Sequence, residues 1–211
     1  MISFLEEIEQ SLPIGLVLPE EFRCLFVWME AGGFVHRYEQ TGERYASLYP
    51  ANLRAGKRGS LVSFEAVKPS TPWFESWTRE RLALFIRTGG DYSQAGLWRS
   101  DEGRQVFVHF GSGSGSTMVC TLTDNPIDLL RLLAIGYQEL CWPEWFAAPP
   151  EAFVEEDEED YLPPTQFREW VETSFGVAIP MTASEIVPHP VDMHDDVSDD
   201  PFWCWVRKHY G

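Results

Sequence analysis

Hydrophobic and polar positions alternate most regularly in the middle of the chain, where the pattern predicts two strands. Apolar and aromatic side chains recur at every second position over residues 106–110, and a similar run returns at residues 118–122. Between the two runs lie six residues of glycine and serine, 111–116. We therefore predict a strand, a flexible connection and a second strand.

A helix is predicted directly after the second of these strands. Asp124 or Asn125 can cap its first amides, and Pro126 is tolerated in its first turn. Leucine, isoleucine and alanine recur at helical spacing over residues 127–135 and form a wide apolar stripe. A stripe of this width predicts a helix that other elements cover on most of its surface.

The N-terminal part of the chain predicts two amphipathic helices and further strands. The first helix stops before residue 12, and the second begins with the sequence LPEEF at residues 18–22 and ends at the glycine pair 32–33. Four more strands are predicted, at residues 45–49, 61–67, 82–86 and 95–99.

Runs of strands and runs of helices, without regular alternation, indicate an α+β fold. We predict an antiparallel or mixed sheet of about four to six strands, with helices packed mainly on one face. Prolines and acidic residues dominate the connection at residues 143–164, a last helix is predicted at residues 167–175, and an irregular tail follows at residues 187–200. The chain then divides into a core, 1–142, and an acidic, aromatic extension, 143–211, packed on that core within a single domain.

The net charge of −17 is concentrated late in the sequence. Residues 151–200 hold fifteen acidic side chains and one basic one, a net charge of −14, whereas the rest of the chain carries −3. An acidic surface attracts basic proteins and repels phosphate backbones, which argues against direct nucleic-acid binding. Glutamates near the N-terminus, no long apolar run and four scattered cysteines predict a cytoplasmic protein with reduced thiols and no membrane contact.

Two acidic segments are the candidate partner-binding surface. Six consecutive carboxylates repel one another, and such a run is typical of an interaction element, although a solubilising loop has the same composition. Aromatic residues at its two ends can anchor a contact that charge has steered. The first segment comprises Phe153, Glu155, Glu156, Asp157, Glu158, Glu159, Asp160 and Tyr161. The second comprises Asp192, Asp195, Asp196, Asp199 and Asp200.

Three patterns suggest chemistry more weakly. The glycine-serine run lacks the lysine and the following helix of a phosphate-binding loop, so a plain connection or a partner-contacting loop is the preferred interpretation. His189, Asp192 and His194 have ligand types for a divalent metal, but the prolines around them argue against a helical metal motif. Cys120 and His109 lie on neighbouring predicted strands without an evident orienting group. We therefore predict no catalytic residues, no metal and no cofactor.

Several of these features together resemble the SUKH superfamily, the Smi/Knr-like proteins. The likeness covers about residues 15–140 and includes the LPEEF helix start, the turn GGD at residues 89–91 and the passage from strand to helix DNPIDLL at residues 124–130. The resemblance implies a protein-binding α+β domain without enzymatic activity. Bacterial members are typically immunity proteins against a cognate toxin, often a nuclease or deaminase.

We therefore expect an immunity protein that occludes the active site of a basic toxin through its acidic surface, acting as a monomer or weak dimer. The alternative is a regulatory or adaptor domain of the same fold without a toxin partner.

Overall fold

A computed structural model describes residues 2–53, 59–68, 80–153 and 161–210 of the chain. Two helices precede the strands of the sheet: α1 (Phe4–Ser11), α2 (Glu20–Ala31), β1 (Val35–Arg37), β2 (Arg44–Ser47), β3 (Ser63–Glu65), β4 (Leu82–Arg87), β5 (Gln94–Arg99), β6 (Gln105–Phe110) and β7 (Val119–Thr123). After the sheet come α3 (Pro126–Ile135), the 3₁₀ turns η3 (Pro143–Ala147) and η4 (Pro150–Phe153), α4 (Thr165–Phe175), the turn η5 (Ala183–Glu185) and α5 (Pro201–Tyr210).

Seven strands form one sheet in chain order, and each strand runs antiparallel to the next. The α+β class and the antiparallel arrangement are confirmed, but the predicted number of four to six strands is wrong. The additional strand is β1, which lies at the edge of the sheet beside β2. Its three residues do not belong to a longer alternating run, whereas those of the equally short β3 lie within the run 61–67 that predicted a strand.

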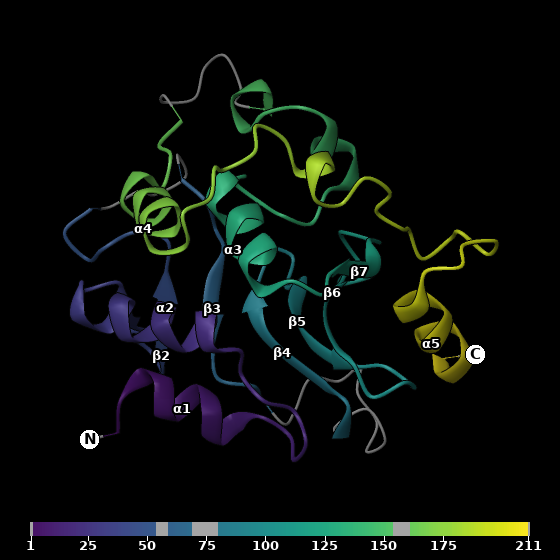
Figure 1. The fold of residues 1–211 in the computed structure, drawn as a ribbon, viewed down its shortest axis with the longest axis horizontal. Coiled ribbons are helices and arrows are strands. Elements are labelled where there is room, and N and C mark those ends of the chain that lie inside the picture. The colour runs from purple at the N-terminus through teal and green to yellow at the C-terminus, as the bar shows by residue number, and fades with distance from the viewer. Residues whose placement is uncertain (1, 54–58, 69–79, 154–160, 211) are drawn as a thin grey trace.

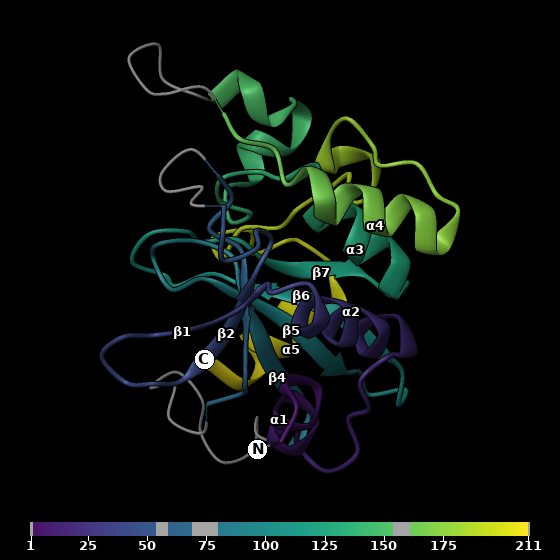
Figure 2. The same cartoon turned by 90° about the vertical axis from the view of Figure 1, so that its left-hand side faces the viewer.

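One face of the sheet is covered by α1, α2 and α3 (Figures 1 and 2). The centre of this layer is Phe22 of α2, whose ring meets Phe64, Phe85 and Phe107 of three different strands at centroid distances of 5.1–6.4 Å. Aromatic pairs in such edge-on and tilted arrangements contribute about 0.5–1.5 kcal/mol each beyond the burial of their area. The LPEEF helix start therefore supplies the central side chain of this face.

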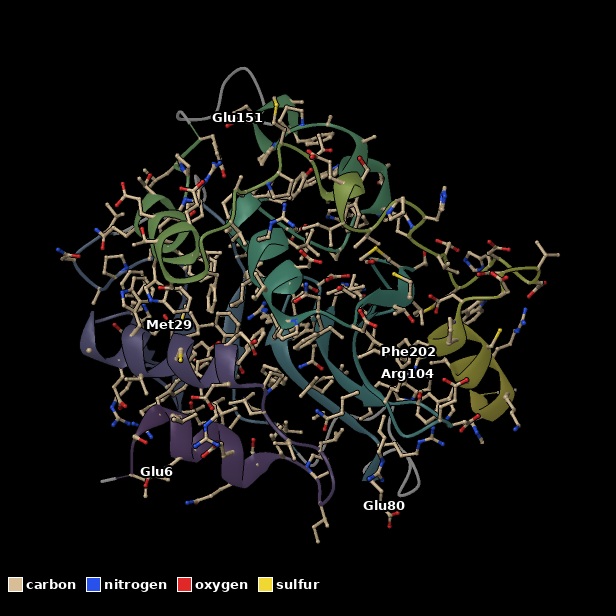
Figure 3. The ribbon with its side chains drawn as sticks, in the orientation of Figure 1. Glu6, Met29, Glu80, Arg104, Glu151 and Phe202 are labelled. Carbon is tan, nitrogen blue, oxygen red and sulfur yellow. The ribbon has the colours of Figure 1, made fainter. Side chains whose placement is uncertain are left out.

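The last helix, α5, was not predicted, and the expectation that residues 167–175 form the final helix is wrong. It lies on the opposite face of the sheet from α2, where Phe202 packs between the helix and the sheet (Figure 3). Its ring is 5.4 Å from that of Trp98 in β5 and 6.4 Å from that of Phe110 in β6. This helix is thus the exception to the prediction that helices cover mainly one face.

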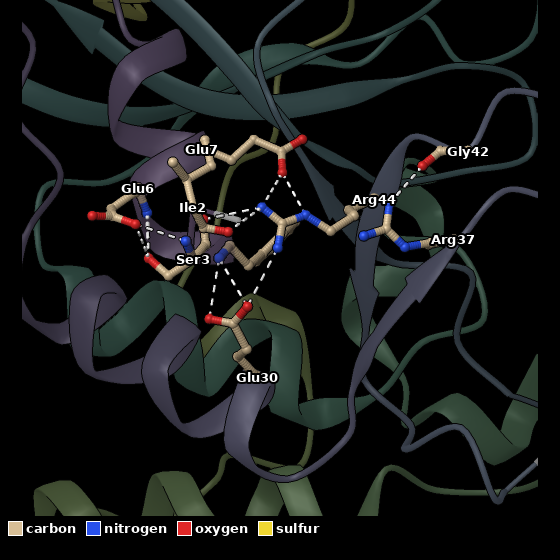
Figure 4. A network of polar contacts seen from close by, with 9 residues as sticks. Ile2, Ser3, Glu6, Glu7, Glu30, Arg37, Gly42 and Arg44 are labelled. Carbon is tan, nitrogen blue, oxygen red and sulfur yellow. Dashed lines mark hydrogen bonds and ion pairs between the residues drawn. The ribbon is translucent and has the colours of Figure 1, made fainter.

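The helical layer is fastened to the sheet by a partly buried ionic cluster around Arg44 of β2 (Figure 4). The Arg44 guanidinium contacts Glu7 of α1 at 2.5 Å and Glu30 of α2 at 3.3 Å. It also donates hydrogen bonds to the carbonyl oxygens of Ile2 and Ser3, each at 3.1 Å. One side chain therefore fixes the start of α1 and the end of α2 against the same strand.

Candidate functional site

The acidic run of the first predicted segment lies outside the described residues. It comprises Glu155, Glu156, Asp157, Glu158, Glu159 and Asp160. Both aromatic residues beside the run contact the body of the protein. The ring of Phe153 stacks on Trp145 at a centroid distance of 4.8 Å, and the Tyr161 hydroxyl donates to the carbonyl oxygen of Gly136 at 2.8 Å. Burial raises the pKa of Tyr161. These two contacts hold both flanks of the acidic run to the body.

The second predicted segment is divided between structural and exposed carboxylates. Asp200 accepts hydrogen bonds from the amides of Trp203 at 2.8 Å and Thr121 at 2.9 Å, so it caps α5 and links that helix to β7. Asp195 closes a turn by accepting from two amides that follow it. Asp196 and Asp199 have exposed side chains and are available to a partner.

The residues considered for metal binding do not converge. Asp192 accepts a hydrogen bond from the Thr117 hydroxyl and another from the amide of His194 at 2.8 Å, while His189 is exposed. Across the described ranges no group of three histidine, cysteine or acidic side chains is arranged to hold a metal ion. Asp192 instead joins the C-terminal segment to the strand region before β7, where residue 192 forms a bridge with Met118.

Cys120 and His109 are cross-strand partners, as the sequence suggested, but both are buried. His109 bonds through its two ring nitrogens to the Thr88 hydroxyl at 2.9 Å and the Met118 carbonyl oxygen at 2.8 Å. Burial lowers the pKa of His109 to about 4 and raises the pKa of Cys120 to about 12. A neutral imidazole beside a protonated thiol, both away from solvent, does not form an activated nucleophile.

A groove that the sequence did not reveal lies on the face of the sheet that carries α5, at the end occupied by β1, β2 and β3. We call it the tyrosine groove, and it has a volume of about 970 Å³. Its lining residues are Arg37, Tyr38, Glu39, Gln40, Thr41, Glu43, Tyr45, Glu65, Lys68, Arg87, Asp91, Tyr92, Gln94, Phe110, Gly111, Ser112 and Ser114. The turn after β1, the turn after β4 and the glycine-serine loop after β6 form its rims, so residues far apart in the sequence meet here.

Two rings that line the groove, those of Tyr45 in β2 and of Tyr38 directly after β1, belong to an aromatic column. Tyr45 is stacked between His36 at 5.1 Å and Tyr38 at 4.4 Å, measured between ring centroids. The Tyr38 hydroxyl donates to Glu65 Oε1 at 2.5 Å, and burial together with this carboxylate raises the pKa of Tyr38. Tyr45 is followed in β2 by the apolar Ala46, which is buried. This alternation was the available sign in the sequence that Tyr45 lies on a different face of the strand from the core.

The glycine-serine loop is held in place by Asp91 rather than left as an unsupported connection. The carboxylate of Asp91 accepts from the Ser112 hydroxyl at 2.7 Å, the Ser116 amide at 2.7 Å and the Ser93 hydroxyl at 2.8 Å. Burial alone would raise the pKa of Asp91, but these bonds and that from the Ser93 amide lower it overall. The expectation of a plain flexible link is therefore corrected: the loop forms a supported wall of the groove.

Comparison of the chain with protein-family models, with curated proteins and with solved structures found no match. The likeness to the SUKH superfamily thus remains one of sequence motifs. Among the helices that the structure describes, none combines the length and the apolar character needed to cross a bilayer.

Proposed function

We propose that this protein is an immunity protein that binds a cognate bacterial toxin and covers its active site. The observation that carries the proposal is the segregation of charge, with −14 in residues 151–200 against −3 elsewhere. Toxins that act on nucleic acid need positively charged grooves for their substrates, and an acidic surface is complementary to such a groove. The exposed side chains of Asp196 and Asp199 support this role.

The positions of the residues considered for catalysis, metal binding and partner contact also support binding over catalysis, because several of them have structural roles. His109 and Cys120 are buried in the sheet, and Asp192 and Asp200 fasten the C-terminal segment to β7 and to the residues before it. The sequence motifs of the SUKH superfamily add a second, independent reason, because that resemblance implies a protein-binding domain.

The test is co-expression with the product of a neighbouring toxin-like reading frame. We expect this chain to restore the growth of cells that produce the neighbouring protein and to co-purify with it in a one-to-one complex. A toxin variant without activity should still co-purify, which separates binding from any destruction of the toxin. Failure of both rescue and co-purification would reject the proposal and favour a regulatory or adaptor domain of the same fold.

A further inference from the structure

We propose that the tyrosine groove is the surface by which the protein selects its toxin, and that it receives a loop presenting an arginine side chain. This inference rests on the proposed function, since it names the contact surface of that complex. It assigns different tasks to two parts of the molecule. The acidic segments attract the partner from a distance, and the tyrosine groove recognises it.

The composition of the groove is that of a protein-recognition surface. Its described lining contains three tyrosines, two arginines and several serine, glycine and glutamine residues, and none of these lining residues is aliphatic. Tyrosine and arginine dominate the energetics of protein interfaces, and tyrosine with serine and glycine is the composition that antibody binding loops use. Charged and polar side chains stand between the aromatic rings of the groove, and this mixture suits a polypeptide ligand.

The exposure and the backbone conformation of Tyr92 indicate a role in binding a partner rather than in folding. Its backbone φ is +70°, and among the described residues it is the non-glycine residue with a positive φ. The residue is 77% exposed, and the Arg87 guanidinium lies 5.0 Å from the centre of its ring. Glycine or asparagine would adopt this backbone conformation at lower cost, and strained residues that persist on a surface are concentrated at binding sites.

The groove is already ordered before a partner arrives. Tyr45 and Tyr38 line the groove and are held in a stack with His36, and the bonds to Asp91 fix the loop on its rim. A surface whose side chains are held in place loses less conformational entropy on binding, so more of the contact energy appears as affinity.

The charges of the groove favour a cationic ligand, because four carboxylates and three cations line it and one negative charge is in excess. The carboxylates are those of Glu39, Glu43, Glu65 and Asp91, and the cations are Arg37, Lys68 and Arg87. Glu43 and Glu65 share one ammonium, that of Lys68, at 3.0 and 3.5 Å. The guanidinium of Arg87 donates instead to the carbonyl oxygens of Gly89 and Gly90. The carboxylate of Glu39 is exposed on the same rim. With the field of a chain of charge −17 around it, this arrangement attracts an arginine, whose planar group also stacks on tyrosine rings.

The experiment measures the affinity of the neighbouring toxin, in an inactive form, for groove variants and matched controls. Tyr92→Asn removes the ring and accepts the left-handed backbone, and Glu65→Gln removes the charge at nearly constant shape. We expect each to weaken binding about tenfold or more, mainly through faster dissociation. Tyr92→Phe should keep the affinity within about threefold, because it retains the ring.

The controls lie on α2 and α4, outside the tyrosine groove and outside both acidic segments. Val27→Asn replaces an exposed apolar residue of α2, and Glu172→Gln removes one charge from an exposed position of α4. Both should bind as the wild type does, and thermal unfolding of all variants checks that the fold is kept. Wild-type affinity in both groove variants would reject this inference while leaving the proposed function intact. Tighter binding by Glu65→Gln would show an anionic occupant and would also reject it, whereas no binding by the wild type would reject both proposals.

Discussion

Single residues in this protein show how the position of a charge decides its energetic effect. Arg44 has a side chain only 9% exposed and contacts Glu7, Glu30 and two carbonyl oxygens, whereas Arg104 is exposed and pairs with Glu102 in a turn. Removing one partner of a buried ion pair costs about 3–5 kcal/mol, because the remaining charges lose their compensation, while exposed pairs contribute about 0–1 kcal/mol. We expect Arg44→Met to lower the free energy of unfolding by about 3 kcal/mol and Arg104→Met by less than about 0.5 kcal/mol in urea titrations. Equal effects would contradict the assigned role of Arg44.

His109 gives a prediction about pH at the same scale. Burial depresses its pKa in the folded protein to about 4, against 6.5 in an exposed chain. Between these values the unfolded chain takes up a proton that the folded protein does not, so the stability from this residue is complete above pH 6.5 and is lost as the pH falls toward 4. The expected loss is about 3 kcal/mol. Asp91, whose pKa is lowered, acts in the same direction, so the measurement compares the wild type with His109→Gln. The variant should show a smaller fall in stability from pH 7 to pH 4, whatever its absolute stability.

The secondary-structure elements show what could be read from the sequence and what could not. Alternation and capping residues predicted β6, β7 and α3, because each of these elements is long enough to repeat its pattern and is largely buried. The three residues of β1 carry no such repeat. The helix α5 was missed because its apolar residues follow an acidic, proline-rich tail, although Asp200 before Pro201 is a helix start. The tyrosine groove is made by turns distant in sequence, which only the strand order brings together.

The start of α5 separates a structural carboxylate from a neighbouring exposed one. Asp200 accepts from the amides of Trp203 and Thr121, while the side chain of Asp199 is exposed. Loss of a helix cap costs about 1 kcal/mol, and the bond to β7 adds to this. We expect Asp200→Ala to lower the free energy of unfolding by about 1–2 kcal/mol and Asp199→Ala to leave it unchanged within about 0.5 kcal/mol. Both variants remove one negative charge, so equal destabilisation would mean that charge, and not the cap, is responsible.

At the scale of the whole molecule the uneven distribution of charge is the property on which the proposed function depends. Exposed charges act over distance in the absence of salt, but they are screened beyond about 8 Å at physiological ionic strength. Attraction of this kind raises the rate of association and leaves the rate of dissociation nearly unchanged. The acidic segments and the tyrosine groove should therefore be distinguishable in binding kinetics, since the groove variants act mainly on dissociation.

Local neutralisation tests this division of tasks. One variant replaces Glu155, Asp157 and Glu159 by their amides. A matched variant makes the same change at Glu20, Glu80 and Asp124, which are exposed in the part of the chain before residue 143. At low ionic strength we expect the first to slow association with the inactive toxin by about three- to tenfold, and the second by less than twofold. The difference should shrink as salt is added, because screening removes the long-range attraction in both proteins. Equal slowing by the two variants would show that net charge alone steers the partner, and unchanged rates across all salt concentrations would show that charge does not steer it at all.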